Sequence, residues 1–174
     1  MLLQNIAQNS PSLSSSTSGR IEIRELDWTV IPDEWIWDND KVIASAATHP
    51  GDSPPSQGLL GPPFDLILSS DTLYSPDLTQ PLLRTLHALS AFSLRGSRPP
   101  PIYLCIERRD PVMVDRALED ARNIWGFIVE RVSHRKVTKM MDKSGVKWAK
   151  DDWEGVEIWK LVLAHRVKED ITVT

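Results

Sequence analysis

Two side chains that could take part in catalysis, Asp71 and Tyr74, follow an apolar run in the segment FDLILSSDTLYSPDL, residues 64–78. A strand that served only as scaffold would end in turn residues, whereas here a carboxylate and a phenol stand three positions apart. The carboxylate can accept hydrogen bonds from an amine, and the phenol adds a hydrogen-bonding group and an aromatic wall. Such a pair could position an amine for attack on carbon, a reaction that positioning accelerates strongly. The alternative is that Asp71 caps the loop and Tyr74 packs under the next helix.

Two further polar pairs also follow predicted strands. Asp27 and Trp28 end the alternating segment RIEIRELDW, residues 20–28, and suit an adenine pocket with an indole beside the base. The alternative for Trp28 is that it faces a helix at a strand end. Glu107 and Arg109 could line a substrate channel or form a surface ion pair. Ligands of open parallel sheets bind outside the carboxyl ends of the strands, where all three pairs are predicted to lie.

The elements that must carry these residues alternate between strand and helix. Apolar alternation predicts a strand over 20–28, and short apolar runs predict strands covered on both faces. The predicted strands after the first span residues 64–70, 101–107, 126–132 and 155–167. An apolar stripe with helical spacing predicts a helix over about 76–94, and a second helix follows Asp110. Because Pro81 would remove an internal hydrogen bond, the first of these helices is expected to begin near Thr79.

This alternation predicts an α/β fold with three layers, in which right-handed crossovers join a mostly parallel sheet covered by helices on both faces. The segment between the last two strands has no clear helical pattern, so these strands are expected to pair antiparallel. Its basic stretch RVSHRKVTK, residues 131–139, is interpreted as a solvated face or a loop. Residues 9–19 and 47–63 are predicted to be flexible loops within a single domain spanning residues 1–174.

Composition excludes several classes of function. The 174 residues carry a net charge of −4, which argues against a nucleic-acid partner. A single cysteine, Cys105, cannot form an intrachain disulfide, and the four histidines lack metal-ligand spacing, so no metal site is predicted. No stretch approaches the length of a membrane span, and no signal peptide is recognised. We therefore expect a cytoplasmic or nuclear protein without a membrane partner.

Four segments in the same order resemble the seven-β-strand protein-lysine methyltransferases: RIEIRELDW, LILSSDTLYSPDLTQPLLRTLHAL, IYLCIERR and VEIWKL. The D-x-x-Y motif of that family is met by residues 71–74 and its E-L-D-W strand end by residues 25–28. The opening LLQNIAQNS is similar to the helix end that precedes this strand in the family. The resemblance implies a Rossmann-like class I methyltransferase fold, S-adenosylmethionine (SAM) as cofactor, and a protein substrate that carries the target lysine.

The resemblance also implies roles for the residues near the lysine. Asp71 and Tyr74 are predicted to be catalytic and to position the amine. Glu107 and Arg109 match the E-x-R that follows a strand in the family, and are predicted to bind substrate. Enzymes that methylate base nitrogens usually carry N/D-P-P-Y/F/W at this rim, whereas this chain has Thr72-Leu73 in place of the two prolines. A protein substrate is therefore favoured over a nucleic acid.

The cofactor-binding prediction rests on Asp27, Trp28, Ser69 and Ser70, the first two of which the resemblance places near the adenine. Other parts of the family's SAM site are missing. The chain begins after the family's first two strands, and its eight glycines nowhere form the G-x-G of the loop that receives the methionine moiety. We therefore expect a partial domain that lacks its first two strands and binds SAM weakly or not at all.

An alternative from a different class is a catalytically inactive methyltransferase remnant, which acts as an interaction module or reflects a truncated gene model. Without the first strand of the family, the predicted strand over residues 64–70 has one bare edge. Such an edge can pair with another chain. Pairing through an exposed sheet edge is therefore a second prediction about partners.

Overall fold

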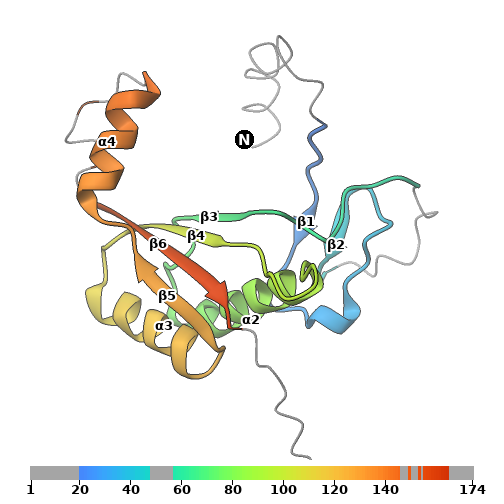
Figure 1. Cartoon of the computed structure of the whole chain (residues 1–174). Coiled ribbons are helices and arrows are strands. Elements are labelled where there is room, and N and C mark those ends of the chain that lie inside the picture. The colour runs from blue at the N-terminus through green and yellow to red at the C-terminus, as the bar shows by residue number, and fades with distance from the viewer. Residues whose placement is uncertain (1–19, 48–56, 146–148, 150–152, 154, 165–174) are drawn as a thin grey trace, which may run out of the picture. The chain divides into compact units, whose positions relative to one another are not determined.

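The chain divides into two compact units, Met1–Gly61 and Pro62–Thr174. The structure, a computed structural model, describes residues 20–47, 57–145, 149, 153 and 155–164 (Figure 1). The predicted loop at 9–19, the helix end similar to the family's at the N-terminus, and most of the predicted loop at 47–63 lie outside these residues. Each unit is described by itself below.

The first unit contains a small parallel sheet. Strand β1 (Glu25–Leu26) pairs with β2 (Val42–Ala44), and a 3₁₀ turn, η1 (Pro32–Glu34), lies between them in the chain. The strand predicted over residues 20–28 is therefore much shorter than expected. Residues 21–24 have the alternating pattern but form no strand. They are held by side-chain contacts instead of the backbone hydrogen bonds of a sheet.

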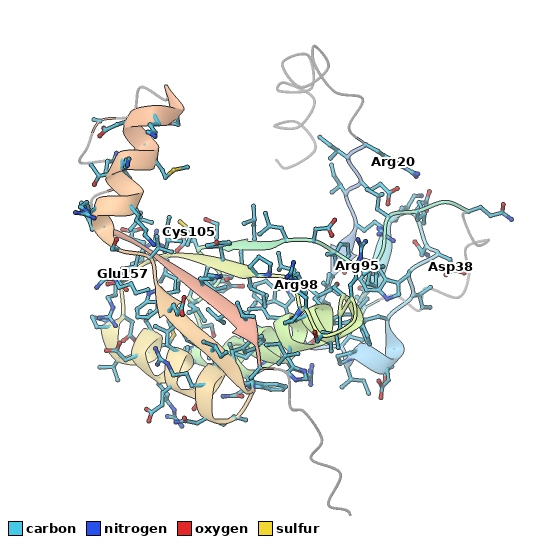
Figure 2. All side chains as sticks on the ribbon, in the orientation of Figure 1. Arg20, Asp38, Arg95, Arg98, Cys105 and Glu157 are labelled. Carbon is cyan, nitrogen blue, oxygen red and sulfur yellow. The ribbon has the colours of Figure 1, made fainter. Side chains whose placement is uncertain are left out.

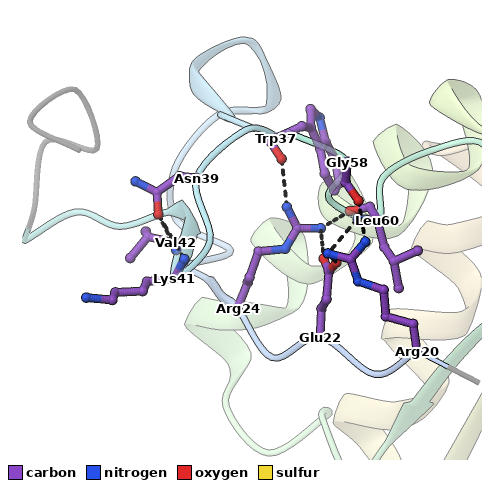
Figure 3. Close-up of polar contacts among 9 residues, drawn as sticks. All are labelled: Arg20, Glu22, Arg24, Trp37, Asn39, Lys41, Val42, Gly58 and Leu60. Atoms are coloured by element: carbon purple, nitrogen blue, oxygen red, sulfur yellow. Dashed lines mark hydrogen bonds and ion pairs between the residues drawn. The ribbon is translucent and has the colours of Figure 1, made fainter. Parts of the chain in front are cut away.

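Those contacts centre on Arg24, whose side chain is 6% exposed (Figure 3). Its guanidinium donates to the carbonyl of Trp37 at 2.8 Å and to the carbonyl of Leu60, and its Nη2 lies 3.6 Å from Oε2 of Glu22. The same Glu22 oxygen accepts from the amide of Leu60 at 2.9 Å. A buried arginine and a largely buried glutamate thus tie residues 22–24 to the segment that ends the first unit.

The second unit is built on a mixed four-stranded sheet. Its order is β3 (Ile67–Ser70), β4 (Ile102–Glu107), β6 (Val156–Leu163) and β5 (Phe127–Arg131). Strands β3 and β4 are parallel, whereas β6 runs antiparallel to both of its neighbours. The predicted antiparallel pairing of the last two strands is confirmed, and β3, β4 and β5 all point the same way.

Two helices, α2 (Pro76–Phe92) and α3 (Pro111–Asn123), pack on one face of this sheet and against each other (Figure 1). They share a face because each crosses over in the same direction along the sheet, and right-handed crossovers in one direction keep to one side. The core lies between these helices and the sheet, and its most buried side chains are Leu82, Leu83, Ile102, Leu104, Val114 and Leu161. The fold is thus a mixed α/β arrangement.

The opposite face of the sheet is not covered as predicted. Among the described residues, α4 (His134–Ser144) is the only helix on that side (Figure 1), and it has no buried residue. The segment interpreted as a solvated face or loop is therefore a helix, and the prediction that no helix joins the last two strands is wrong. Its polar composition hid the helix, because eight of its eleven residues are charged, hydroxyl-bearing or histidine and only three are apolar.

The starts of α2 and α3 show how sequence positions the rim loops. Helix α2 begins at Pro76 after Ser75, so the predicted start near Thr79 is wrong. Pro81 is accommodated inside the helix, at the cost of one backbone hydrogen bond. Helix α3 begins as predicted after Asp110, whose carboxylate accepts from the amide of Met113 at 3.0 Å. None of the helices formed by the described residues has the length and apolar character that crossing a membrane requires.

Candidate functional site

The residue that follows β3, Asp71, holds an uncommon backbone conformation. Its amide donates to the carbonyl of Cys105 at 2.9 Å, which prolongs the β3–β4 ladder by one bond. Its φ is then +52°, the left-handed region that few residues other than glycine occupy. A hydrogen bond of 2.7 Å between the hydroxyls of Ser69 and Thr72 closes the turn. The turn places Asp71 at the carboxyl end of β3.

A charge cluster forms around Asp71. Nη2 of Arg109 lies 3.4 Å from Oδ2 of Asp71 and 2.5 Å from Oε2 of Glu107, to which Nε also donates at 2.9 Å. The hydrogen bond to Glu107, and then the charge of Asp71, raise the pKa of Arg109 above its usual value. The structure therefore brings together three of the predicted site residues, and it also realises the surface ion pair considered for Glu107 and Arg109.

Tyr74 follows Asp71 by three positions in the chain and is exposed to solvent. Its side chain is 62% exposed, so the alternative in which it packs under the helix is wrong. Leu73 is buried in its place, at 7% exposure, and anchors the loop between Asp71 and α2. Within the described residues, the phenol forms no hydrogen bond or ring contact. It is thus open to a ligand, while the loop that carries it is fixed by its neighbour.

Ser69 and Ser70, predicted to bind cofactor, end β3 beside Asp71. The hydroxyl of Ser69 is engaged with Thr72, and Ser70 is exposed. Both line a hollow on the face of the sheet that α2 and α3 leave uncovered. Their part in cofactor binding stays a prediction.

Asp27 forms the centre of a turn in the first unit. Its amide donates to the carbonyl of Ala44 at 3.0 Å, directly after β1. Its carboxylate accepts from the hydroxyl and amide of Thr29 at 2.7 and 2.8 Å, and from the amide of Ala46 at 3.3 Å. These bonds, chiefly those from Thr29, lower the pKa of Asp27. Both oxygens thus hold the local fold, which weakens the prediction that this carboxylate receives an adenine amine.

Asp27 and Trp28 belong to the first unit, and the other predicted site residues to the second. Their convergence on one crevice stays a prediction. What the structure does bring together is the group at the ends of β3 and β4. This group consists of Asp71, Glu107 and Arg109. Together with Tyr74, which follows Asp71 by three positions in the chain, it is called the rim cluster below.

Sequence reasoning missed the hollow on the uncovered sheet face, a groove of about 720 Å³ between that face and α4. Cys105 is half-buried and lines this groove (Figure 2). A signal was present in residues 137–141, where Val137, Met140 and Met141 share one side of a helix. Three apolar residues among basic ones were too few to outweigh the polar composition.

Among the described residues, no group of three or more His, Cys, Asp or Glu side chains could hold a metal ion. No protein-family model matches the chain, and no curated protein matches it. The rim cluster, the sheet and the sequence motifs are therefore the features that bear on function.

Proposed function

We propose that this chain is part of a SAM-dependent protein-lysine N-methyltransferase domain, in which the rim cluster receives the target lysine. The observation that carries the proposal is Asp71. Its carboxylate stands at the carboxyl end of β3, and its backbone has the left-handed conformation that few residues other than glycine adopt. Backbone strain of this kind gathers at functional sites, where a side chain must be aimed rather than packed.

The charges of the rim cluster suit a lysine. Two carboxylates and one guanidinium give a net charge of −1, which attracts an ammonium group. Oδ2 of Asp71 faces Arg109, while Oδ1 has no partner within the described residues and can accept a hydrogen bond from the amine. The exposed ring of Tyr74 supplies a wall along which the aliphatic part of the lysine can lie.

The order of the sheet supports the same proposal. Strands β3, β4 and β5 run in the same direction, and β6 lies antiparallel between β4 and β5. The site then falls outside the carboxyl ends of parallel strands, where ligands of such sheets bind.

The described residues fit SAM poorly. Gly58, Gly96, Gly126 and Gly145 have positive φ, but none lies in the turn between a strand and the N-terminus of a following helix, where a phosphate or cofactor loop would need it. The oxygens of Asp27 are engaged by backbone and threonine donors. We therefore assign this chain the lysine-positioning part of the reaction and expect it to bind SAM weakly or not at all when alone.

Tritium-labelled SAM tests the enzyme proposal. The purified chain is incubated with a high concentration of labelled SAM and a protein extract, and label on lysine is measured. Asp71→Asn should lower the transfer at least about tenfold, because a neutral amide orients an amine less well than a carboxylate. Asp65→Asn is the matched control, since Asp65 is an exposed carboxylate at the other end of the same strand, paired with Arg95 at 3.3 Å. Equal labelling by both variants contradicts the role of the rim cluster.

A second candidate is an inactive remnant that acts as an interaction module. It is favoured by strand β3, which pairs only with β4 and whose other edge has no strand partner among the described residues. Absence of any lysine labelling by the wild-type chain, together with no heat of SAM binding in isothermal titration, supports this candidate. Micromolar SAM binding contradicts it, and also contradicts the weak binding expected above.

A further inference from the structure

Methyl transfer leaves the groove between α4 and the sheet unexplained. Its floor is the face of the sheet opposite α2 and α3, and one wall is a side of α4. Two rows of side chains cross this floor through the strand register, Leu68–Tyr103–Lys160–Glu130 and Ser70–Cys105–Ile158. The wall is formed by Lys136, Val137, Met140 and Met141. We call this feature the α4 groove.

The α4 groove is apolar and open. Leu68 on its floor is 72% exposed and Met140 on its wall is 66% exposed. Tyr103, Cys105 and Ile158 are half-buried between them. Isolated exposed apolar residues need no explanation, but a contiguous apolar hollow marks a surface for binding.

The polar groups of the α4 groove are mainly basic. Lys160 on the floor and Lys136 on the wall form no ion pair and no side-chain hydrogen bond within the described residues. Arg131 at the edge is paired with Glu157 at 2.8 Å. Of the charged side chains that line the groove, Arg131, Lys136 and Lys160 are basic and Glu130 is acidic. An apolar surface with a net positive charge is complementary to an apolar ligand with carboxylates.

The floor also determines which backbone conformation fits. Apart from the outer edge of β3, backbone groups of the floor are already paired along the strands, so the face of the sheet offers a ligand side-chain contacts and no backbone hydrogen bonds. A bound segment must therefore satisfy its own backbone, as a helix does. An amphipathic helix that lays its apolar side in a groove is a common mode of recognition.

We propose that the α4 groove binds an acidic amphipathic helix of a partner protein. The apolar side of this helix covers Leu68, Ile158 and Met140. Its carboxylates pair with Lys136 and Lys160. This inference does not depend on methyl transfer, since the α4 groove needs neither the rim cluster nor SAM.

A pair of synthetic peptides tests the proposal by fluorescence anisotropy with the full chain. Each labelled peptide has about 18 residues, with leucine at helical three- and four-residue spacing and either glutamate or lysine elsewhere. The glutamate peptide should bind saturably, at least about tenfold more tightly than the lysine peptide. The double variant Lys136→Glu/Lys160→Glu should reverse this order. If the double variant does not fold, Lys136→Glu alone, at an exposed helix position, is used. It should reduce the difference in affinity between the glutamate and lysine peptides.

Two further variants locate the binding. Arg135→Glu is the matched charge control, because Arg135 belongs to the same helix but does not line the α4 groove. It should leave the preference unchanged. Leu68→Ser should weaken binding of the glutamate peptide several-fold, with little change in stability, because the side chain is already exposed. Equal binding of both peptides, no binding, or an Arg135→Glu effect equal to that of Lys136→Glu overturns the proposal. Dimerisation in sedimentation that Leu68→Ser abolishes, without peptide binding, makes a second copy the occupant and also overturns it.

Discussion

Substitutions of Asp71 can separate its contribution to stability from its role in the rim cluster. The left-handed conformation, with φ +52°, costs an L-residue about 1 kcal/mol, and glycine avoids this cost. Glycine also gives the unfolded chain more freedom, which costs about 0.5–1 kcal/mol. The ion pair with Arg109 joins two exposed side chains and adds little. Asp71→Gly should therefore leave the free energy of unfolding within about 1 kcal/mol of wild type.

A β-branched residue at the same position should behave differently. Asp71→Val places a branched side chain in a conformation it rarely adopts, and should destabilise the second unit by about 1–2 kcal/mol. Asp71→Asn tolerates the conformation and should be close to wild type in stability. Lysine labelling should nevertheless fall in all three variants, because each lacks the carboxylate.

Urea unfolding followed by tryptophan fluorescence and circular dichroism measures these differences, with m-values compared to check that the unfolding transition is of the same kind. A decrease of more than about 2 kcal/mol in the free energy of unfolding of Asp71→Gly would refute this reasoning. Such a loss would mean that the carboxylate holds the loop together. The positive φ would then be a requirement of the fold and no sign of a binding site.

Three other predictions concern stability. Burial lowers the pKa of His87, so folding favours the neutral imidazole. Its contribution to the free energy of unfolding is therefore complete above the unfolded pKa of about 6.5 and is lost as the pH falls from there toward the folded pKa. His87→Phe should remove this pH dependence, measured by urea unfolding between pH 5 and 8. Pro81→Ala should raise stability by about 1 kcal/mol, because it restores an amide that can donate to the carbonyl of Asp77; an unchanged melting temperature would contradict this. Arg24→Met should destabilise the first unit by about 2–4 kcal/mol, since it leaves the carboxylate of Glu22 largely buried and poorly compensated. Arg20→Met, at an exposed partner of the same carboxylate, should cost less than about 1 kcal/mol when both are measured by hydrogen exchange of the amide of Leu60.

The sequence predicted the second unit well where local signals agreed. Strands β3, β4, β5 and β6 all fall within the predicted ranges, because each is a short apolar run bounded by turn residues. The start of α3 followed from Asp110-Pro111, a cap followed by a proline. The same reasoning misplaced the start of α2, since a proline six positions into a helix costs one hydrogen bond, and the apolar contacts of Leu82 and Leu83 outweigh that loss.

The rim cluster was predictable for a physical reason. Residues at the carboxyl ends of neighbouring parallel strands must meet, so the pairing of β3 with β4 brings Asp71 to Glu107 and Arg109 whatever the loops do. The positive φ of Asp71 was not predictable, since it depends on the exact turn between strand and helix. In the first unit, alternation over residues 20–24 indicated a longer strand, but nothing local revealed that Arg24 would be buried against the carbonyls of Trp37 and Leu60.

The mismatch between pattern and exposure on the sheet is itself informative. The runs that form β3 and β5 have apolar residues at successive positions, which is typical of strands covered on both faces. In the structure one face is covered, while Leu66, Leu68 and Ile128 on the other remain 48%, 72% and 54% exposed. A face that is solvated in the working protein would tolerate polar residues at these positions, as half-buried strands do. Apolar side chains there fit a protein in which this face is covered, and α4, which buries none of its own residues, does not provide that cover. The acidic amphipathic helix proposed above provides such cover, because its apolar side meets the apolar floor and its carboxylates meet Lys136 and Lys160.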